Sequence, residues 1–314
     1  MKCGLIGKGL KFILDKNYRF LFLASRGKYD SMNDEEYIKR KYKAIFGTEL
    51  DLENPKTYNQ KIQWLKLYYR RPDYTQYVDK YEVRSYVAKT IGEEHLVPLL
   101  GVWDSPKDIE FDKLPSKFVL KCNHNSGLGM CICENKDELQ TNRVISGLEK
   151  GLKQNYYLTG REWPYKNVKR RIIAEKFLVD ESGVELKDYK LYCFDGKVRL
   201  IMVNSDRNSK CATKADYFDE DFNHIDMIWG YEQADITPKK PAHFEEMKML
   251  AEKLSKDMPH VRVDFYVADD KVYFGEMTFF DGSGFDAFEK IEYANMLGDW
   301  IKLPAPIEES DTVM

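Results

Sequence analysis

The chain has 314 residues, of which 43% are hydrophobic and 32% are charged, so it can bury a large core and divide into two or three lobes. Its 49 basic and 52 acidic residues give a net charge of −3, which argues against a general nucleic-acid-binding protein, because such proteins neutralise phosphates with a basic surface. The six cysteines include no Cys-x-x-Cys pair with matching histidines, so we predict no zinc site and expect reduced thiols, as in a cytoplasmic protein.

The first 30 residues mix apolar and basic side chains in a pattern typical of a basic amphipathic helix. No apolar run reaches the roughly 18 residues that a membrane-spanning helix requires, and lysines interrupt what would be the core of a signal peptide. Two interpretations remain. The helix lies on the anionic inner face of a membrane, or it packs on the body of the protein, which is the commoner role of such a helix.

Three further helices are predicted before the first strand. Asn33 is a suitable N-cap for a charged helix that ends at Gly47. Residues 57–69 place apolar and aromatic side chains at helical spacing, and we assign them to the core or to a contact between lobes, without any chemistry. Residues 77–91 predict one more helix, which ends at Gly92.

Residues 118–132 predict two short strands joined by a polar loop. The first strand ends at Lys121, and the loop contains Ser126, Gly127 and Gly129. Glycine lets backbone N–H groups approach a phosphate closely, and a lysine adds positive charge at the same place. The segment has neither a P-loop nor a dinucleotide fingerprint. A hairpin without a ligand would need the same glycines, so both interpretations stay open.

Two more segments have the pattern of apolar strands. Residues 171–179 contain one acid, Glu175, and such a strand can present backbone groups to an adenine edge, although a purely structural role is more common. Residues 188–203 predict a hairpin with an Asp-Gly turn. This hairpin carries Lys190, for which a solvated face is the ordinary environment and a phosphate contact is the alternative.

The most informative segment lies near the C-terminus, where apolar strands are predicted at 261–267 and 272–278 on either side of an acidic turn. Asp264 and Glu276 each stand among apolar residues, where unpaired carboxylates are costly. Mg²⁺ prefers oxygen ligands and is usually bound by one or two carboxylates together with substrate phosphates. The pattern therefore favours a magnesium site over a nucleotide's phosphates, and a hairpin whose acids face solvent is the alternative.

Taken in order, these segments resemble the ATP-grasp superfamily, and more closely its TupA-like branch of amide-forming ligases, from about Phe46 to Trp300. The strings that carry the resemblance are Asn54-Pro-Lys-Thr-Tyr-Asn59-Gln-Lys-Ile-Gln-Trp64-Leu-Lys-Leu, Val78-Asp-Lys80-Tyr-Glu-Val-Arg84, Phe118-Val-Leu-Lys121-Cys-Asn-His124, and Val261-Arg-Val-Asp264 followed by Gly275-Glu276-Met-Thr278 and Gly282-Ser-Gly284. Their order and spacing together are more specific than any one of them. The resemblance implies an α/β (α+β) ATP-grasp fold, in which two α+β lobes with antiparallel sheets clasp ATP behind a helical N-terminal region.

We accordingly predict four regions along the chain. A basic amphipathic N-terminal helix occupies 1–30, and a helical region follows at 31–75. The first ATP-grasp lobe, with the glycine-containing phosphate loop, occupies 76–170, and the second lobe, with the metal site, occupies 171–314. The sequence contains neither internal repeats nor a low-complexity linker, so each boundary is a change of pattern.

The resemblance also implies roles for individual residues. Catalysis would fall on Arg262, Lys190 and Lys121, close to the transferred phosphate. The nucleotide would be bound by Lys80, Arg84, Lys121, His124, Ser126, Gly127, Gly129, Glu175, Lys176, Phe177 and Leu178, of which the last four would clasp adenine. Mg²⁺ would be bound by Asp264, Glu276 and Thr278, the last standing where many superfamily members have asparagine. His124 and His260 lie near these motifs; structural hydrogen bonding is their commoner role, and proton removal from an amine is the alternative.

The activity that the resemblance implies is that of an ADP-forming ligase, which uses ATP and Mg²⁺ to make an amide through an acyl phosphate. Phosphoryl transfer depends on positioning and charge neutralisation, which suits lysines, an arginine and metal-bound carboxylates. TupA-like proteins are associated with bacterial surface polysaccharides. The expected substrates are therefore a small-molecule or glycan carboxylate and an amine, used in capsule or cell-envelope synthesis in the cytoplasm or at the inner membrane face. The alternatives are a kinase of the same fold acting on a glycan hydroxyl, and a non-catalytic nucleotide-binding module of a glycan-assembly complex.

Overall fold

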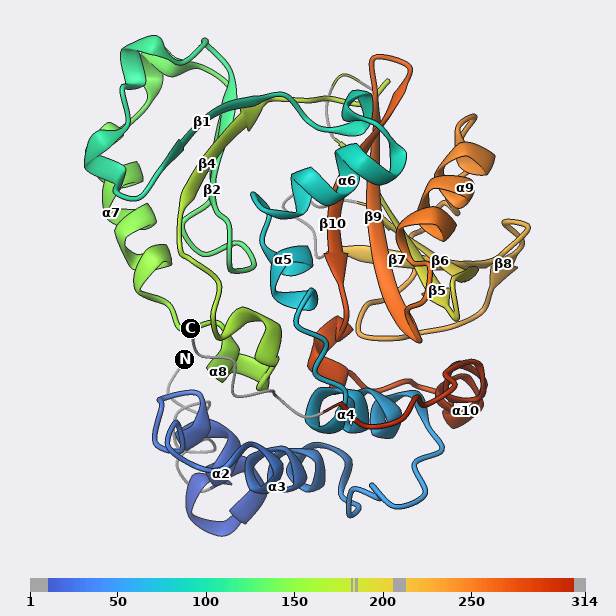
Figure 1. The fold of residues 1–314 in the computed structure, drawn as a ribbon. Helices are drawn as coiled ribbons and strands as arrows, with labels where there is room; N and C mark the ends of the chain where they lie inside the picture. Colours follow the sequence, from blue (N-terminus) through green and yellow to red (C-terminus); the bar gives the residue numbers. More distant parts are fainter. Residues whose placement is uncertain (1–10, 182, 184–185, 206–212, 308–314) are drawn as a thin grey trace.

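Two antiparallel sheets organise the residues that the computed structural model describes, which are 11–181, 183, 186–205 and 213–307. The smaller sheet has the strand order β1-β4-β2-β3, and the larger has the order β10-β9-β5-β6-β7-β8. Figure 1 shows the smaller sheet with α7 on one side of the molecule, the larger sheet with α9 on the other, and the N-terminal helices across one end. This is the α+β architecture with antiparallel sheets that we predicted.

Part of the basic amphipathic helix that we predicted for residues 1–30 can be compared with the structure. Residues 1–10 lie outside the described part of the chain, and helix α2 covers only Lys16–Ala24. The carboxylate of Asp15 accepts hydrogen bonds from two backbone N–H groups of the first turn of α2, so the chain starts a new helix there. Phe20 of α2 is buried against α3 (Asp34–Phe46), so the described part of this segment packs on the body of the protein.

Helices α3 and α4 (Tyr58–Tyr68) begin where the sequence predicts. Asn33 caps α3, and Gly47 ends it in a left-handed conformation. Thr57 caps α4 by accepting from the backbone N–H of Gln60, whose side chain accepts in return from the backbone of Thr57. The N-terminal region is therefore helical, as expected.

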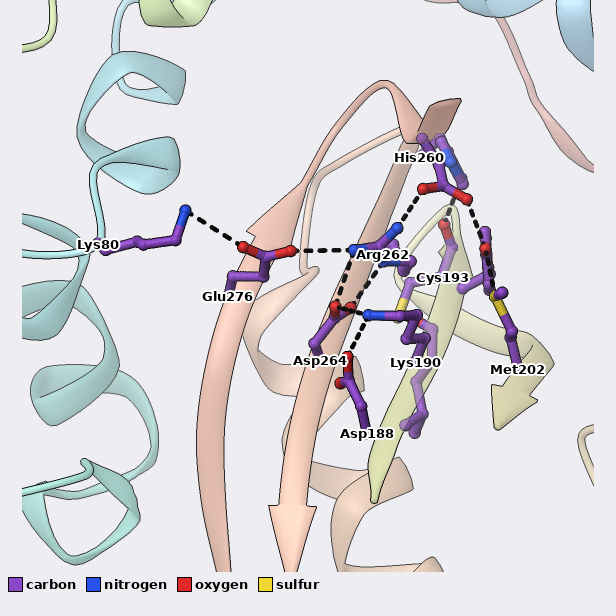
Figure 2. Close-up of polar contacts among 12 residues, drawn as sticks. Lys80, Asp188, Lys190, Cys193, Met202, His260, Arg262, Asp264 and Glu276 are labelled. Atoms are coloured by element: carbon purple, nitrogen blue, oxygen red, sulfur yellow. Dashed lines mark hydrogen bonds and ion pairs between the residues drawn. The ribbon is translucent and has the colours of Figure 1, made fainter. Parts of the chain in front are cut away.

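The helix predicted for residues 77–91 is in fact two helices, α5 (Tyr74–Val78) and α6 (Val83–Ile91). Asp79 interrupts it, because its carboxylate accepts from the backbone N–H groups of Tyr81 and Glu82, just before α6, and from the amide of Asn123 at 2.8 Å. The break places Lys80 outside both helices, where its side chain is free to point toward the larger sheet (Figure 2).

The smaller sheet comprises β1 (Leu99–Trp103), β2 (Phe118–Cys122), β3 (Cys131–Cys133) and β4 (Ile172–Lys176). Alternate apolar residues of β2 and β4 form a core with Leu148 of helix α7 (Thr141–Lys153). Because β4 pairs with both β1 and β2, this sheet continues past the lobe boundary that we predicted after residue 170.

The larger sheet comprises β5 (Asp188–Phe194), β6 (Lys197–Ser205), β7 (Lys214–Asp219), β8 (His224–Ile225), β9 (His260–Ala268) and β10 (Lys271–Thr278). Helix α9 (Phe244–Leu254) covers one face, where its apolar residues join the main core. Both predicted hairpins form, and the turn residues Asp195, Asp269 and Asp270 have positive φ angles, as two-residue hairpin turns require. The opposite face of this sheet carries polar side chains.

The remaining elements are short, apart from helix α10 (Ile291–Trp300), which packs beside α4. They are α8 (Tyr157–Gly160), η1 (Glu93–His95), η2 (Pro106–Asp108), η3 (Phe111–Lys113), η4 (Lys136–Glu138), η5 (Trp163–Tyr165) and η6 (Asp281–Gly284). Among the described residues, no helix combines the length and the apolar character that crossing a bilayer demands.

Candidate active site

The polar face of the larger sheet gathers five of the predicted site residues. Strands β5, β9 and β10 are neighbours, and their register pairs Asp264 with both Lys190 and Glu276 and pairs Arg262 with Thr278. Residues two apart on a strand point to the same face. All five side chains therefore lie on one face of three adjacent strands, as the paired-carboxylate pattern predicted for Asp264 and Glu276.

A continuous line of ion pairs connects the four charged side chains among them, and Lys80 and Asp188 extend it at its two ends (Figure 2). Arg262 donates from Nε to Oδ1 of Asp264 at 2.7 Å and from Nη2 to its Oδ2 at 2.8 Å, and the same Nη2 lies 3.1 Å from Oε1 of Glu276. Nζ of Lys190 lies 2.5 Å from Oδ2 of Asp264 and also pairs with Asp188. Nζ of Lys80, from the break between α5 and α6, lies 3.3 Å from Oε2 of Glu276.

The cations around Glu276 determine its ionisation. Burial alone would raise the pKa of its carboxyl group, but Lys80, Arg262 and Lys190 together lower that pKa well below its usual range. Glu276 is therefore an anion at any physiological pH. Its side chain keeps 34% of its surface exposed, whereas that of Asp264 keeps 1%, so Glu276 is the carboxylate that a solute can reach.

A cavity of about 350 Å³ lies over this polar face. Its walls include Lys80, Ser126, Tyr156, Glu162, Tyr165, Lys190, Asn204, Trp229, Arg262, Glu276, Thr278, Asp281 and Ser283. The wall opposite the sheet comes from η5 and η6 and the residues beside them, where the hydroxyl of Ser283 donates to Glu162 at 2.6 Å.

Asp281 and Glu162 are site residues that sequence reasoning missed. Asp281 accepts from Nη1 of Arg262 and from the hydroxyl of Tyr192, the latter at 2.6 Å. Its position three residues after Thr278, in a glycine-containing turn, is a signal that could have identified it. Glu162 is 95 residues or more from every strand of the C-terminal hairpin, and nothing in its local sequence marks it.

A second cavity, of about 540 Å³, is lined by residues of both sheets. Val119 and Ile132 come from the smaller sheet and Asn204 and Tyr266 from the larger, and Asn204 also lines the first cavity, so the two cavities adjoin. Further lining residues are Lys121, Glu175, Lys176, Phe177 and Leu178. The structure thus brings the residues predicted to bind adenine together around one cavity between the sheets.

Glu175 holds two basic side chains beside this second cavity. Nζ of Lys121 lies 2.6 Å from Oε2 of Glu175, and Nη1 of Arg84 lies 3.6 Å from Oε1. Lys121 therefore stands at the cavity wall, while Arg84 reaches the site through Glu175 and is not among the residues that line either cavity.

The two glycines of the predicted phosphate loop have different environments. A Cβ atom on Gly127 would meet nothing within 4 Å, whereas a Cβ on Gly129 would lie 2.9 Å from the carbonyl oxygen of Gly147 in α7. Nζ of Lys80 donates to the carbonyl of Asn125 at 2.9 Å, which ties the start of the loop to the ion-pair line. Gly127 is thus open to a ligand, and Gly129 is needed for packing against α7.

His124 does not lie where we predicted. Its side chain is 1% exposed, its Nε2 lies 3.2 Å from the carbonyl of Gln154, and it lines neither cavity. Burial lowers its pKa to about 4, so the imidazole is neutral. The strand β2 ends at Cys122, and Asn123, His124 and Asn125 after it are all buried, so the side chain of His124 reaches neither cavity in this conformation.

The carboxylates suit Mg²⁺ only together with further oxygen ligands. Both oxygens of Asp264 are held by Arg262 and Lys190, and the described residues contain no group of three or more acidic, histidine or cysteine side chains placed to bind a metal. Glu276 and Thr278 both line the first cavity. Mg²⁺ commonly takes one or two carboxylates and completes its shell with phosphate and water, so this donor set fits a metal that binds with a nucleotide.

Comparison with known proteins adds a family and a set of solved structures. A family model described as TupA-like ATPgrasp matches residues 60–302. No curated protein matches the chain significantly. The D-alanine–D-alanine ligase from Bacillus anthracis is 21% identical, with a TM-score of 0.41 over 72% of this chain and 66% of that one, just under two thirds of its length. The corresponding ligase from Helicobacter pylori is 18% identical, with a TM-score of 0.45 over 78% and 69%. The ATP-grasp ligase PsnB, in a complex with a precursor variant, Mg and ADP, is 9% identical, with a TM-score of 0.40 over 81% and 65%.

Proposed function

This chain belongs to the TupA-like ATP-grasp family, whose cofactors are ATP and Mg²⁺, and we propose that it is an ATP-dependent ligase that joins a carboxylate to an amine. The observation that supports this most strongly is the line of ion pairs from Lys80 through Glu276, Arg262 and Asp264 to Lys190, in the wall of the first cavity, which adjoins the cavity between the sheets. It sets positioned cationic and anionic groups, of which Glu276 is the most exposed, next to a site large enough for a nucleotide base. Phosphoryl transfer requires such positioned charge and no covalent nucleophile.

The second cavity is the proposed nucleotide site. Phe177 and Leu178 give it apolar walls for an adenine ring, and β4 supplies backbone groups at its edge. Lys121 would contact the phosphates, and Lys80 would meet them where the two cavities adjoin. Gly127 and Ser126 would approach the same phosphates, because nothing in the described structure covers the loop at Gly127.

The first cavity is the proposed reaction site. When bound, ATP and Mg²⁺ would convert the substrate carboxylate into an acyl phosphate, from which an amine then displaces phosphate. Glu276 and Thr278 would hold the metal, and Asp264 would complete the site by exchanging its contact with Lys190. Lys190 would then be free to neutralise the transferred phosphoryl group, and Arg262, which also lines the first cavity, would add its charge while it stays paired with Asp264. The walls around Glu162 and Asp281 would limit the access of water to that phosphoryl group.

The substrates we propose are an acidic group of a bacterial surface polysaccharide, or its precursor, and an amino acid or other amine. A cavity of about 350 Å³ holds a single sugar or amino acid rather than a long chain. Tyr156 and Tyr165 stand in its wall with their rings 4.7 Å apart, and they would contact one face of a sugar. Trp229 is covered by Phe288 in a stacked contact at 4.5 Å, so it serves packing instead.

We also propose that the protein works at the inner face of the membrane. Ile13 and Leu14 expose 67% and 72% of their surface, and Phe22 exposes 39%, next to the basic residues of the same segment. Apolar side chains flanked by lysines and arginines suit an anionic lipid surface. Phe20, on the buried side of α2, packs on α3, so such contact would leave the body of the protein intact.

The test is amine-dependent ADP release over a panel of uronic and amino acids, with hydroxylamine trapping. A trapped hydroxamate supports the ligase, whereas ADP release without any trapped product argues for a kinase. Glu276→Gln should lower ADP release by about a hundredfold or more, because it removes a charge that holds the metal. Glu252→Gln is the matched control, since Glu252 pairs with Lys197 outside both cavities. Unchanged turnover in Glu276→Gln would refute the assignment.

A further inference from the structure

Helix α4 carries a row of polar side chains on its buried face. Asn59, Gln63 and Lys66 follow one another at helical spacing and are 4%, 0% and 1% exposed. Burying an amide or an ammonium group costs several kcal/mol unless hydrogen bonds replace its water. Apolar residues would serve packing at lower cost, so the bonds that these three side chains make define their role.

All three side chains donate to backbone carbonyls of one loop. Asn59 donates to Gly284 at 3.1 Å and to Asp286 at 2.9 Å. Gln63 donates to Ser283 at 3.1 Å and to Gly284 at 2.9 Å, and Lys66 donates to Ser283 at 2.8 Å. The backbone of the loop at 281–286 is therefore hydrogen-bonded to α4, and these bonds do not depend on the side chains of the loop.

Lys66 also connects the loop to the facing wall of the first cavity. Its Nζ donates to the carbonyl of Gly160 at 2.7 Å, and Gly160 lies so close to Ser283 that a Cβ atom on it would be 2.0 Å from the Ser283 hydroxyl. The bond from Ser283 to Glu162 joins the same two segments. One buried lysine side chain thus joins, through its two hydrogen bonds, the two walls that do not belong to the sheet.

The loop has a conformation that needs such support. Gly282 and Ser283 have φ angles of 53° and 54°, and the left-handed region is unfavourable for a residue with a side chain such as serine. This conformation presents Asp281 to Arg262 and to Tyr192. Without bonds to its carbonyls, the loop would relax and Asp281 would lose its place beside Arg262.

We infer that α4 is a positioning element of the active site, in which Lys66, aided by Gln63 and Asn59, fixes the 281–286 loop and thereby the orientation of Arg262. Lys66 contacts no reacting group and acts through the loop. This inference rests on the proposed function, because the orientation of Arg262 affects turnover only if Arg262 serves the transferred phosphate. It makes the N-terminal helical region part of the catalytic unit.

The test compares two lysines of the same helix. Lys66→Met removes the bonds to Gly160 and Ser283 and keeps the length of the side chain. Lys61→Met is the matched control, because Nζ of Lys61 donates to the carbonyls of Gly298 and Ile301, outside both cavities, at 2.8 and 2.9 Å. Hydrogen exchange of the amides at 281–286 should become about tenfold faster or more in Lys66→Met and stay unchanged in Lys61→Met, since only Lys66 donates hydrogen bonds to this loop.

Turnover gives a second readout, which a merely structural role would not move in the same way. In Lys66→Met the kcat of amine-dependent ADP release should fall while the KM for ATP stays unchanged, since the second cavity is untouched. If Lys66→Met does not fold, Gln63→Glu is tested in its place. Glutamate has the shape of glutamine but lacks the amide group that donates to the carbonyls of Ser283 and Gly284. Equal exchange at 281–286 in these variants and the wild type would overturn the inference. The two proposals can fail separately. If the wild type forms no hydroxamate, the ligase assignment is refuted. Faster exchange at 281–286 in Lys66→Met would in that case still show that Lys66 positions the loop.

Discussion

Arg262 and Asp264, two residues apart on β9, form a bidentate ion pair whose two bonds measure 2.7 and 2.8 Å, and both side chains are at least nine-tenths buried. Nη2 of Arg262, one of the two nitrogens that bind Asp264, also donates to Oε1 of Glu276 on β10. A planar guanidinium can serve two carboxylates at once, which a lysine ammonium does with less directional control. The two carboxylates predicted to meet at a metal therefore meet first at an arginine.

Asp264→Asn should destabilise the fold strongly. The change leaves Arg262 and Lys190 buried with one anionic partner fewer, and breaking a buried ion pair costs about 3 to 5 kcal/mol. Urea unfolding followed by circular dichroism measures the loss. Glu276→Gln is the comparison, and its cost should be smaller because that side chain is 34% exposed. Equal stabilities of Asp264→Asn and the wild type would show that the pair contributes nothing to the fold.

Lys121→Met should weaken ATP binding about tenfold to a hundredfold, which corresponds to one charge-assisted hydrogen bond. The reason is that Lys121 lines the cavity between the sheets, with its charge held in place by Glu175. Titration calorimetry with a non-hydrolysable ATP analogue and Mg²⁺ measures the affinity. Lys197→Met, which removes a lysine paired with Glu252 outside the cavities, should bind the analogue as the wild type does. Comparable affinities of Lys121→Met and Lys197→Met would exclude Lys121 from the nucleotide site.

The two loop glycines should respond differently to alanine. Gly129→Ala brings a Cβ atom to 2.9 Å from the carbonyl of Gly147 at a φ of +83°, so it should lower the free energy of unfolding. Gly127→Ala has space for the methyl group, and its left-handed backbone should lower the free energy of unfolding by only about 1 to 2 kcal/mol. The main effect of this substitution should therefore be on nucleotide affinity. Thermal unfolding and calorimetry separate the two effects. The reverse assignment of effects would contradict the proposed loop.

His260 should make the fold less stable in mild acid. Its Nδ1 donates to the carbonyl of Cys193 at 3.0 Å, its Nε2 accepts from the hydroxyl of Tyr58 at 3.1 Å, and burial lowers its pKa to about 4. The unfolded chain binds this proton near pH 6.5, so the contribution of the neutral ring is complete above pH 6.5 and is lost as pH falls toward 4.

The expected loss at pH 4 is about 3 kcal/mol, obtained by linkage from the pKa difference. Urea unfolding of the wild type and of His260→Gln between pH 7 and pH 4 measures it, and the variant should lack this part of the acid sensitivity. An NMR titration of the ring protons provides a check, since His260 should stay neutral at pH 5.5. Protonation of His260 near pH 6.5 in the folded protein would contradict the prediction.

Much of the sheet and half of the site follow from the sequence alone. A two-residue acidic turn between apolar strands predicts the hairpin of β9 and β10, but its regular register would place Glu276 opposite Val263. A register irregularity between Phe274 and Glu276 pairs Glu276 with Asp264 instead and so brings both carboxylates to one face, which the sequence does not show. The apolar runs of β2 and β4 likewise predict strands, and the cap at Asn33 predicts a helix start, because these signals are local and act within a few residues.

Only the tertiary structure decided which distant groups contact the side chains of these strands and helices. The chain places Lys190 against Asp264 from 74 residues away, and it turns His124 inward, where a loop glycine pattern had suggested a ligand. The sequence assigned α4 to the core or to a contact between lobes, but the partners of its polar row, the carbonyls of the 281–286 loop, appear only in the folded chain. The physical reason is that periodicity tells which side chains share a face, whereas the partner that desolvates or neutralises that face comes from a distant segment and depends on how the whole chain packs.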